Sequence, residues 1–197
     1  MTTSGGGGGI IVRRATSADL DTVVALRIAL LREYGEHPIY GRLRADAERR
    51  ARPMFATQLD SDNEVMFLAE ENHVAIGLIR CVESAASPLL IPDRYCYVSS
   101  VYVRPDHRRR GVLRKLVERA RGWCRERGLT EMRLHNVGTR TSTAAAWDSL
   151  GFEVVEQVRV LRLENVDGPA AINMYADTSM LPPRGAPPAS PEGELHP

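Results

Sequence analysis

The sequence predicts an α/β (α+β) fold, in which helices flank a mixed, largely antiparallel twisted sheet. Segments rich in Val, Ile and Tyr alternate with segments whose apolar residues recur at helical spacing. Read along the chain, the expected elements follow the order β-α-α-β-β-β-α-β-α-β-β, an α/β mixture around a sheet. The 197 residues, 43% of them hydrophobic, suffice for one domain with a full hydrophobic core.

The two ends of the chain differ in composition from the middle. Residues 1–9 end in five consecutive glycines, and residues 181–197 hold six of the twelve prolines. Neither segment can offset the entropy of ordering by burying apolar side chains, so both are expected to be disordered. The folded domain is therefore expected to span residues 10–180.

The first part of the domain is expected to contain one strand and two helices. Ile10–Arg14 has the pattern of a short strand, and Thr16–Asp19 resembles a capping box with Asp in place of Glu or Gln. Apolar residues at helical spacing then predict a helix from Leu20 to about Tyr34. After a break that contains two glycines and a proline, a second helix is expected over about Ala45–Leu59.

Three strands are expected next, followed by a helix. Glu64–Glu70 and His73–Glu83 are apolar runs separated by Glu71-Asn72, which predicts a hairpin. Arg94–Arg104 is the third strand of this group. The helix after it is expected to begin past Gly111 and to end at Gly128. The remaining expected elements are a strand, a helix that stops at Gly151 and two final strands: Met132–Val137, Ala144–Leu150, Phe152–Val155 and Val158–Leu163.

The stretch Tyr97–Lys115 combines a strand, a basic turn and the start of a helix. The strand ends at Val103-Arg104-Pro105, and Gly111 opens an amphipathic helix. Unpaired N–H groups and the helix dipole favour an anion at a helix start, and glycine lets the backbone approach it. The stretch contains neither G-x-x-x-x-G-K-[ST] nor G-x-G-x-x-G. It therefore predicts a phosphate site unlike the two familiar nucleotide loops.

This stretch resembles motif A of the GCN5-related N-acetyltransferases, the GNAT superfamily. The family pattern is [R/Q]-x-x-G-x-[G/A] after a strand that ends in V-x-P. Arg108, Gly111 and Val103-Arg104-Pro105 match this pattern, whereas Leu113 stands where a small residue is usual.

A second local match lies in the later helix, where the family often has an asparagine, an alanine and a tyrosine ahead of a Gly-Phe pair. Ala144 and Gly151-Phe152 match it, whereas Thr141 replaces the asparagine and Trp147 the tyrosine. The order of elements also agrees with the family, so the resemblance covers nearly the whole folded domain.

The resemblance implies transfer of an acetyl group from acetyl-CoA, the co-substrate, to a primary amine. It assigns the pyrophosphate to main-chain N–H groups from Arg108 to Arg114, with charge-assisted contacts from side chains. Backbone around Ser100–Val103 would donate to the oxyanion and pair with the pantetheine arm. The implied acetyl-CoA site consists of Val101, Tyr102, Val103, Arg108, Arg109, Arg110, Gly111, Val112, Leu113, Arg114, Thr141 and Ala144.

The family's usual glutamate base has no counterpart here, because Tyr95–Val103 contains no acidic residue. An alkyl amine arrives protonated and has to lose a proton before it attacks. The candidates left open for this proton are a water chain and four side chains: Glu33, Glu36, His37 and Glu70. Tyr102, Tyr175 or solvent are the candidates for protonating the thiolate, because an indole N–H such as that of Trp147 does not release a proton usefully.

Several other residues have both a functional and a structural interpretation. By the resemblance, Glu33–Tyr40 would form a wall of the acceptor site, but ordinary loop polarity explains the segment equally well. Trp123 and Trp147 are expected in the core, and His73 and His135 are expected to be structural residues of strands.

Composition excludes several classes of function. The formal net charge of +1 argues against a nucleic-acid partner. Cys81, Cys96 and Cys124 form no metal or disulfide pattern, suit a reducing cytoplasm and are expected to be inert. No apolar run is long enough for a bilayer, and no signal peptide is recognised, so no membrane partner is expected.

The leading hypothesis is a cytoplasmic N-acetyltransferase that uses acetyl-CoA by direct transfer, because no cysteine of the motif is placed as an acyl carrier. A small-molecule amine is favoured over a protein amine, and a homodimer is left open. The alternative is a catalytically inactive acyl-CoA-binding regulatory module of the same fold, suggested by Leu113, Trp147 and the missing glutamate. A third hypothesis, a nucleic-acid binder independent of acyl-CoA, predicts strongly salt-dependent binding.

Overall fold

The computed structural model describes residues 9–35, 37–137 and 141–162, with only the backbone described at 141 and 142. The chain separates into two units, Met1–Gln157 and Val158–Pro197, and the fold below belongs to the first. The disordered ends predicted at 1–9 and 181–197 lie outside the described residues, apart from Gly9. The predicted domain limits of 10 and 180 stay predictions.

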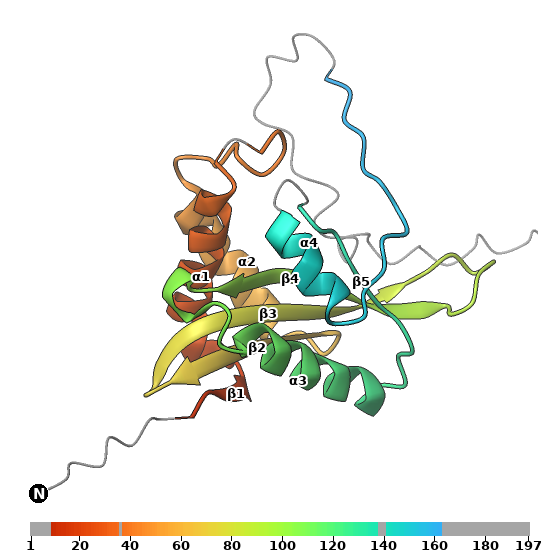
Figure 1. Ribbon diagram of the computed structural model, residues 1–197. Coiled ribbons are helices and arrows are strands. Elements are labelled where there is room, and N and C mark those ends of the chain that lie inside the picture. The colour runs from red at the N-terminus through yellow and green to blue at the C-terminus, as the bar shows by residue number, and fades with distance from the viewer. Residues whose placement is uncertain (1–8, 36, 138–140, 163–197) are drawn as a thin grey trace, which may run out of the picture. The chain divides into compact units, whose positions relative to one another are not determined.

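Five strands form one sheet in the described residues, in the order β1-β2-β3-β4-β5 (Figure 1). The first four strands pair antiparallel in sequence order, and β5 runs parallel to β4. The bounds of the strands are Ile11–Arg14, Glu64–Glu71, Val74–Ala85, Arg94–Val103 and Met132–Leu134. The mixed, largely antiparallel sheet predicted from the sequence is therefore confirmed.

Helices cover both faces of the sheet (Figure 1). One face packs against α1 (Leu20–Glu33) and α2 (Ala47–Leu59), and the other against α3 (Val112–Glu126) and α4 (Thr141–Asp148). Neighbouring strand residues point to opposite faces, and each face has its own buried cluster. Buried side chains of β2 alternate between the two clusters along Val65, Met66, Phe67, Leu68 and Ala69.

The predicted helices are all present, with small differences at their ends. The capping box before α1 is confirmed, since the backbone N–H of Thr16 donates to Oδ2 of Asp19 at 2.8 Å. The amphipathic helix predicted after Gly111 is also confirmed: the buried residues of α3 are Val112, Leu116, Val117, Ala120, Trp123 and Cys124. Helix α4 begins at Thr141 and ends at Asp148, whereas Ala144–Leu150 was expected.

The turn between β2 and β3 lies one residue later than predicted. Glu71 still pairs with Val74, so the two turn residues are Asn72 and His73, with φ of +50° and +63°. A two-residue hairpin turn favours positive φ at both positions, and Asn tolerates that conformation. His73 is therefore a turn residue, and its predicted position in a strand is wrong.

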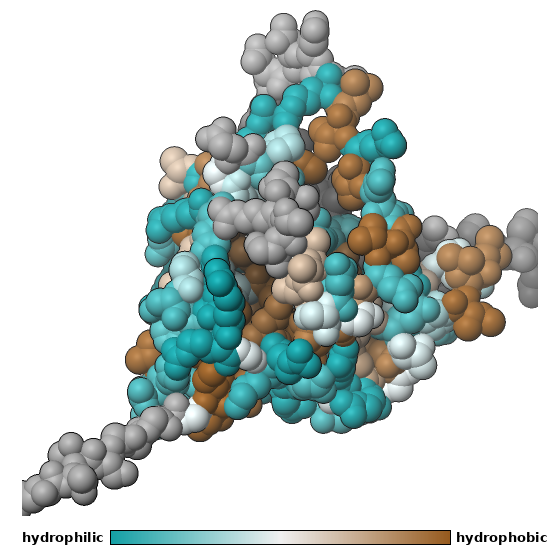
Figure 2. Space-filling view, viewed as in Figure 1, coloured by the Kyte–Doolittle hydropathy of each residue, from teal (hydrophilic) through white to brown (hydrophobic). Residues whose placement is uncertain are grey.

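The predictions after α3 fail in part. Strand β5 stops at Leu134 rather than at Val137, and the described residues 152–162 form no strand. Apolar side chains in this last segment are exposed (Figure 2), with Val154 at 83% and Val155 at 88%. Their β propensity predicted strands, but a strand also needs a neighbouring edge for its hydrogen bonds, and sequence alone does not supply one.

Candidate active site

An uncovered strand edge lies where β5 leaves β4. The last pair between these strands joins Val98 and Leu134, whereas β4 continues to Val103. Its other edge stays paired with β3, with a register shift that accompanies a φ of +52° at Ser100. From Ser99 onward, no described strand covers the outer edge of β4. Its backbone groups there are able to pair with an extended ligand as an added strand would.

The side chains along this edge belong to the two cores. Val101 and Val103 pack against the cluster under α3, and Tyr102 is buried in the cluster under α1. The side chains of these three residues therefore hold the last part of β4 in position beside the uncovered edge.

Eight residues separate the end of β4 from the start of helix α3, and the last of them, Gly111, has a φ of +80°. The N–H of Lys115 donates to the carbonyl of Gly111 at 3.1 Å. The N–H groups of Val112, Leu113 and Arg114 come before this first helical bond and have no helical partner. A Cβ at Gly111 would meet nothing within 4 Å, so the φ value, not crowding, favours glycine at this helix start.

The arginines near this helix start divide into two groups. Arg108 donates to the Val103 carbonyl at 2.9 Å and to both carboxylate oxygens of Glu33 at 2.6 and 2.7 Å, so it ties the loop to α1. Arg110 pairs with Glu71 at 2.6 Å. Arg109 and Arg114 are exposed, and no residue in the described part of the chain forms a hydrogen bond or ion pair with either side chain. These two guanidinium groups are available to an anion.

Leu113 and Trp147, which depart from the two family motifs, pack against the core. Val112 is buried and Leu113 half-buried, and Leu113 packs against the core under α3. Ala144 is half-buried in α4, whereas the side chain of Thr141 lies outside the described residues. Trp147 is buried and contacts the Phe152 ring edge-on with the centroids 5.3 Å apart. Its predicted core role is confirmed.

A tyrosine and a histidine meet beside the uncovered edge. Tyr97 lies on β4 just before that edge begins, and its hydroxyl is 3.2 Å from Nδ1 of His135, the first residue after β5. Burial raises the pKa of Tyr97 to about 12, so its hydroxyl stays protonated at neutral pH. A neutral imidazole whose Nδ1–H donates to the Tyr97 hydroxyl oxygen has its free lone pair on Nε2. His135 is exposed and lies just beyond β5, so its predicted position in a strand is wrong, whereas its structural role stays a prediction.

The proton acceptors proposed from the sequence are engaged elsewhere. Both oxygens of Glu33 accept hydrogen bonds from Arg108. Nδ1 of His37 accepts from the N–H groups of Ile39 and Tyr40, both at 3.1 Å, and so closes a turn. Glu36 and Tyr175 lie outside the described residues.

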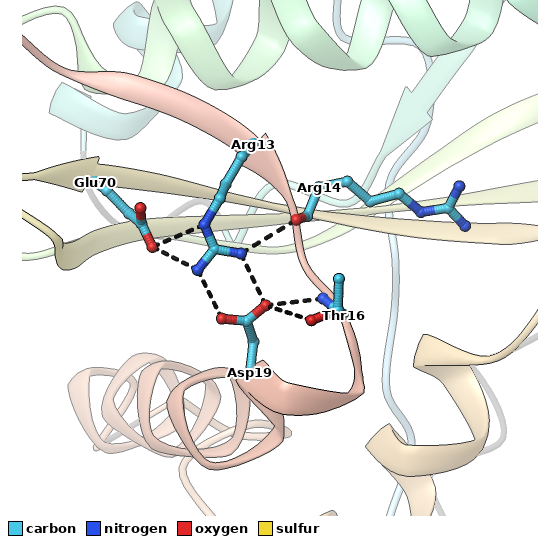
Figure 3. Close-up of polar contacts among 5 residues, drawn as sticks. All are labelled: Arg13, Arg14, Thr16, Asp19 and Glu70. Carbon is cyan, nitrogen blue, oxygen red and sulfur yellow. Dashed lines mark hydrogen bonds and ion pairs between the residues drawn. The ribbon is translucent and has the colours of Figure 1, made fainter.

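Glu70 belongs to an ion-pair cluster at the start of the domain (Figure 3). Arg13 lies between Glu70 and Asp19, at 2.6 Å from Oε1 of the former and 2.7 Å from Oδ1 of the latter. The hydrogen bonds from Arg13 hold the pKa of Asp19 at about 2. These contacts give Glu70 a structural role in joining β1 to β2.

Tyr102 is buried, and its pKa is raised, first by burial and then by the nearby Glu33 carboxylate, with which it forms a hydrogen bond. It is therefore part of the network that joins β4, α1 and Arg108. The three cysteines are buried and free, and contact with the Cys96 thiol together with burial raises the pKa of Cys124. In the ranges that the structure describes, no group of three metal-ligating side chains occurs, and no helix is long and apolar enough to cross a membrane.

A helix start with unpaired N–H groups beside an uncovered strand edge is the arrangement expected of a protein that binds an extended ligand with a phosphate group. The model of the acetyltransferase (GNAT) family matches residues 29–152, which include both features. The chain belongs to this family, and the resemblance seen in its motifs is confirmed.

The match with solved structures of the same fold extends over nearly the whole length of those structures. A GCN5-related N-acetyltransferase from Ralstonia eutropha is 22% identical with a TM-score of 0.66, and the match covers 78% of this chain and 99% of that one. An acetyltransferase from Clostridium acetobutylicum with acetyl-CoA is 19% identical with a TM-score of 0.65, over 78% and 96%. The aminoglycoside N-acetyltransferase AAC(6')-Iy in complex with CoA is 21% identical with a TM-score of 0.66, over 84% and 100%. No curated protein matches the sequence significantly.

Proposed function

We propose that the protein transfers an acetyl group from acetyl-CoA to the primary amine of a small molecule by direct transfer. The observation that carries this proposal is that the uncovered edge of β4 leads, through a loop of eight residues, to the start of α3, and we take these two features as one binding path. The co-substrate fits this path, because a pyrophosphate needs N–H donors at one end and a pantetheine arm needs an unpaired strand edge along its length.

Different residues along this path would bind the pyrophosphate and the pantetheine arm. The N–H groups of Val112, Leu113 and Arg114, with the free guanidinium groups of Arg109 and Arg114, would hold the pyrophosphate. The backbone of Ser99 to Val103 would pair with the arm and donate to the carbonyl oxygen of the thioester. Acetyl-CoA supplies an activated acyl group with a thiolate as the leaving group.

The proton acceptor we propose is His135. It stands with Tyr97 at the end of the path that lies farthest from the start of α3, where the thioester is expected. Nε2 of His135 takes a proton from the ammonium group, the amine nitrogen then bonds to the acetyl carbon as the C–S bond breaks, and the thiolate takes the second amine proton through solvent. Tyr97 orients the imidazole through Nδ1 and stays protonated.

A small acceptor is supported by the names of several structural neighbours. The structures of similar fold include aminoglycoside N-acetyltransferases that are 18–23% identical to this chain. Their identity is too low to transfer a substrate, but they support a small amine over a protein as the acceptor class.

Isothermal titration with acetyl-CoA tests the proposed path, with desulfo-CoA and ATP as comparison ligands. Gly111→Glu adds a carboxylate at the helix start, where it repels the pyrophosphate, and we expect the affinity for acetyl-CoA to fall at least about 100-fold. Gly128→Glu is the matched control, because Gly128 also has a positive φ, of +68°, and open space around its Cβ position, but lies at the other end of α3.

Both substitutions impose the same kind of backbone strain, roughly 1–2 kcal/mol, so the two variants should melt at similar temperatures. Equal affinities of the two variants for acetyl-CoA would remove Gly111 from the pyrophosphate site. Tight binding without turnover on any amine would instead favour the regulatory acyl-CoA-binding module.

A further inference from the structure

Arg27 is a cation on the core-facing side of α1. It follows the buried Val23 by four residues and precedes the buried Leu30 by three, so all three lie on one side of the helix. The residue is half-buried. Within residues 9–35, 37–137 and 141–162, no hydrogen bond or ion pair engages its guanidinium group. A charge withdrawn from water without a partner is costly, and proteins rarely retain one that has no role.

The neighbouring Arg80 is a buried arginine that, unlike Arg27, is paired with a carboxylate. It lies on β3, two residues from Leu78, which belongs to the core under α1. Its Nε donates to Glu64 at 2.7 Å, and both side chains are almost fully buried. A second nitrogen of Arg80 donates to the hydroxyl of Ser99 at 3.3 Å. The fold therefore supplies a carboxylate for Arg80.

The surroundings of Arg27 contain phenols and a second cation. The described groups that act on it electrostatically are Tyr34, Tyr40, Tyr97 and Arg80, and none of them is a carboxylate. Burial lowers the pKa of Arg27, which is the effect of an environment that does not compensate its charge. An anion from outside the chain would complete this site.

The same phenols connect Arg27 to the proposed transfer site. The rings of Tyr34 and Tyr40 pack with their planes tilted by 40° and their centroids 5.5 Å apart, and the His37 ring lies 5.0 Å from that of Tyr40. These three residues after α1 form an aromatic group. Tyr97 contacts His135 at the start of the uncovered β4 edge and also acts on Arg27. The unpaired cation thus lies on the α1 face, beside the residues that would receive the amine.

We propose that the acceptor carries a carboxylate as well as a primary amine, as an amino acid does, and that Arg27 binds this carboxylate. This inference rests on the proposed acetyl transfer and narrows its substrate. A guanidinium group offers a carboxylate two parallel N–H donors, and the aromatic group beside it suits the carbon skeleton of such a molecule. A polycationic aminoglycoside would add positive charge next to Arg27 and Arg80, so it is disfavoured.

The test compares three acceptors that differ at one group: an amino acid, its primary amide and its decarboxylated amine. Tyrosine, tyrosinamide and tyramine form one such set, and the other amino acids are surveyed in the same way, with an aminoglycoside as the polycationic probe. Release of CoA is measured as kcat/KM. We expect the acid to exceed its amide and its amine by about 10- to 100-fold, as one charge-assisted contact allows.

In Arg27→Gln, the ratio of kcat/KM for the acid to kcat/KM for its amide or amine should fall to about one, mainly because KM for the acid rises. KM for acetyl-CoA should stay unchanged. Arg27→Lys should retain part of the preference. Arg32→Gln is the matched control, because Arg32 is an exposed arginine of the same helix. This variant should keep the full wild-type preference for the acid. Arg27→Met should melt at or above the wild-type temperature, because it removes a half-buried charge, so loss of the preference would not reflect unfolding.

Direct binding separates this inference from the proposed function. If acetyl-CoA binds but no amine is turned over, titration with N-acetyl amino acids and their amides in the presence of CoA reports on Arg27. If acetyl-CoA does not bind, the acetyl-transfer proposal fails, and titration with the free amino acids still tests the carboxylate site. Stronger binding of the acids that Arg27→Gln abolishes supports the inference. Equal binding of acids and amides, or a wild-type preference for tyramine or the aminoglycoside, overturns it.

Discussion

The Asp19 carboxylate offers a stability prediction whose size follows from the structure. Asp19 accepts hydrogen bonds from two nitrogens of Arg13, at 2.8 and 2.7 Å, and from the Thr16 N–H at 2.8 Å. These contacts lower its pKa from 3.8 to about 2. At about 1.4 kcal/mol per pKa unit, the difference corresponds to at most about 2.5 kcal/mol. Since the Arg13 side chain is 40% exposed and screened by water, we expect roughly 1–2 kcal/mol.

Urea unfolding of Asp19→Asn and of the wild type, monitored by circular dichroism at several pH values, measures the contribution of the Asp19 contacts to the free energy of unfolding. The folded pKa lies below the unfolded value, so the stabilisation is fully present above about pH 4 and is lost as the pH falls toward 2. The variant should therefore be less stable than the wild type by roughly 1–2 kcal/mol at pH 7, and the difference should narrow below pH 4.

Asp21→Asn is the control for this measurement. Asp21 lies in the first turn of α1 and pairs with Arg52, but its side chain is 78% exposed. An exposed pair contributes little, so this variant should lose less than about 1 kcal/mol. A difference for Asp19→Asn that stays constant from pH 7 to pH 3, or that equals the effect of Asp21→Asn, would refute the role assigned to the cluster.

Two further predictions concern the site and the core. His135→Gln should lower kcat by roughly 100-fold and remove the acidic limb of its pH profile, with the affinity for acetyl-CoA unchanged; an unaltered pH profile would exclude His135 as the proton acceptor. Trp147→Phe should cost about 1–2 kcal/mol, or roughly 3–8 °C in Tm, because it leaves space in the core beside Phe152. Its kcat should stay near the wild-type value, and a selective loss of turnover at normal Tm would contradict the core role of Trp147.

The phosphate-binding helix start could be predicted because its parts are contiguous in sequence. Val103, Arg108 and Gly111 lie within nine residues, and strand, turn and helix follow one another with no need of a distant partner. The alternation of β2 and the helical spacing of α3 likewise predicted which side chains are buried, because these periods belong to the local backbone.

The acceptor side could not be predicted, because its residues meet across the fold. Arg108 and Glu33 are 75 residues apart, and Tyr97 and His135 are 38 apart. Arg27 has the spacing of a core-facing residue, which was a usable signal, but its lack of a carboxylate partner depends on what β3 and β4 present to α1.

The sequence by itself determined the family, the sheet of mixed direction and the helix start that suits a pyrophosphate. Local hydrogen bonding, side-chain period and chain direction are properties of consecutive residues, so they can be read without coordinates. The tertiary structure alone decided which arginines are ion-paired, where β5 leaves β4, and which phenols surround Arg27. These features depend on distances between separate elements, and burial then determines how strongly each charge needs a partner.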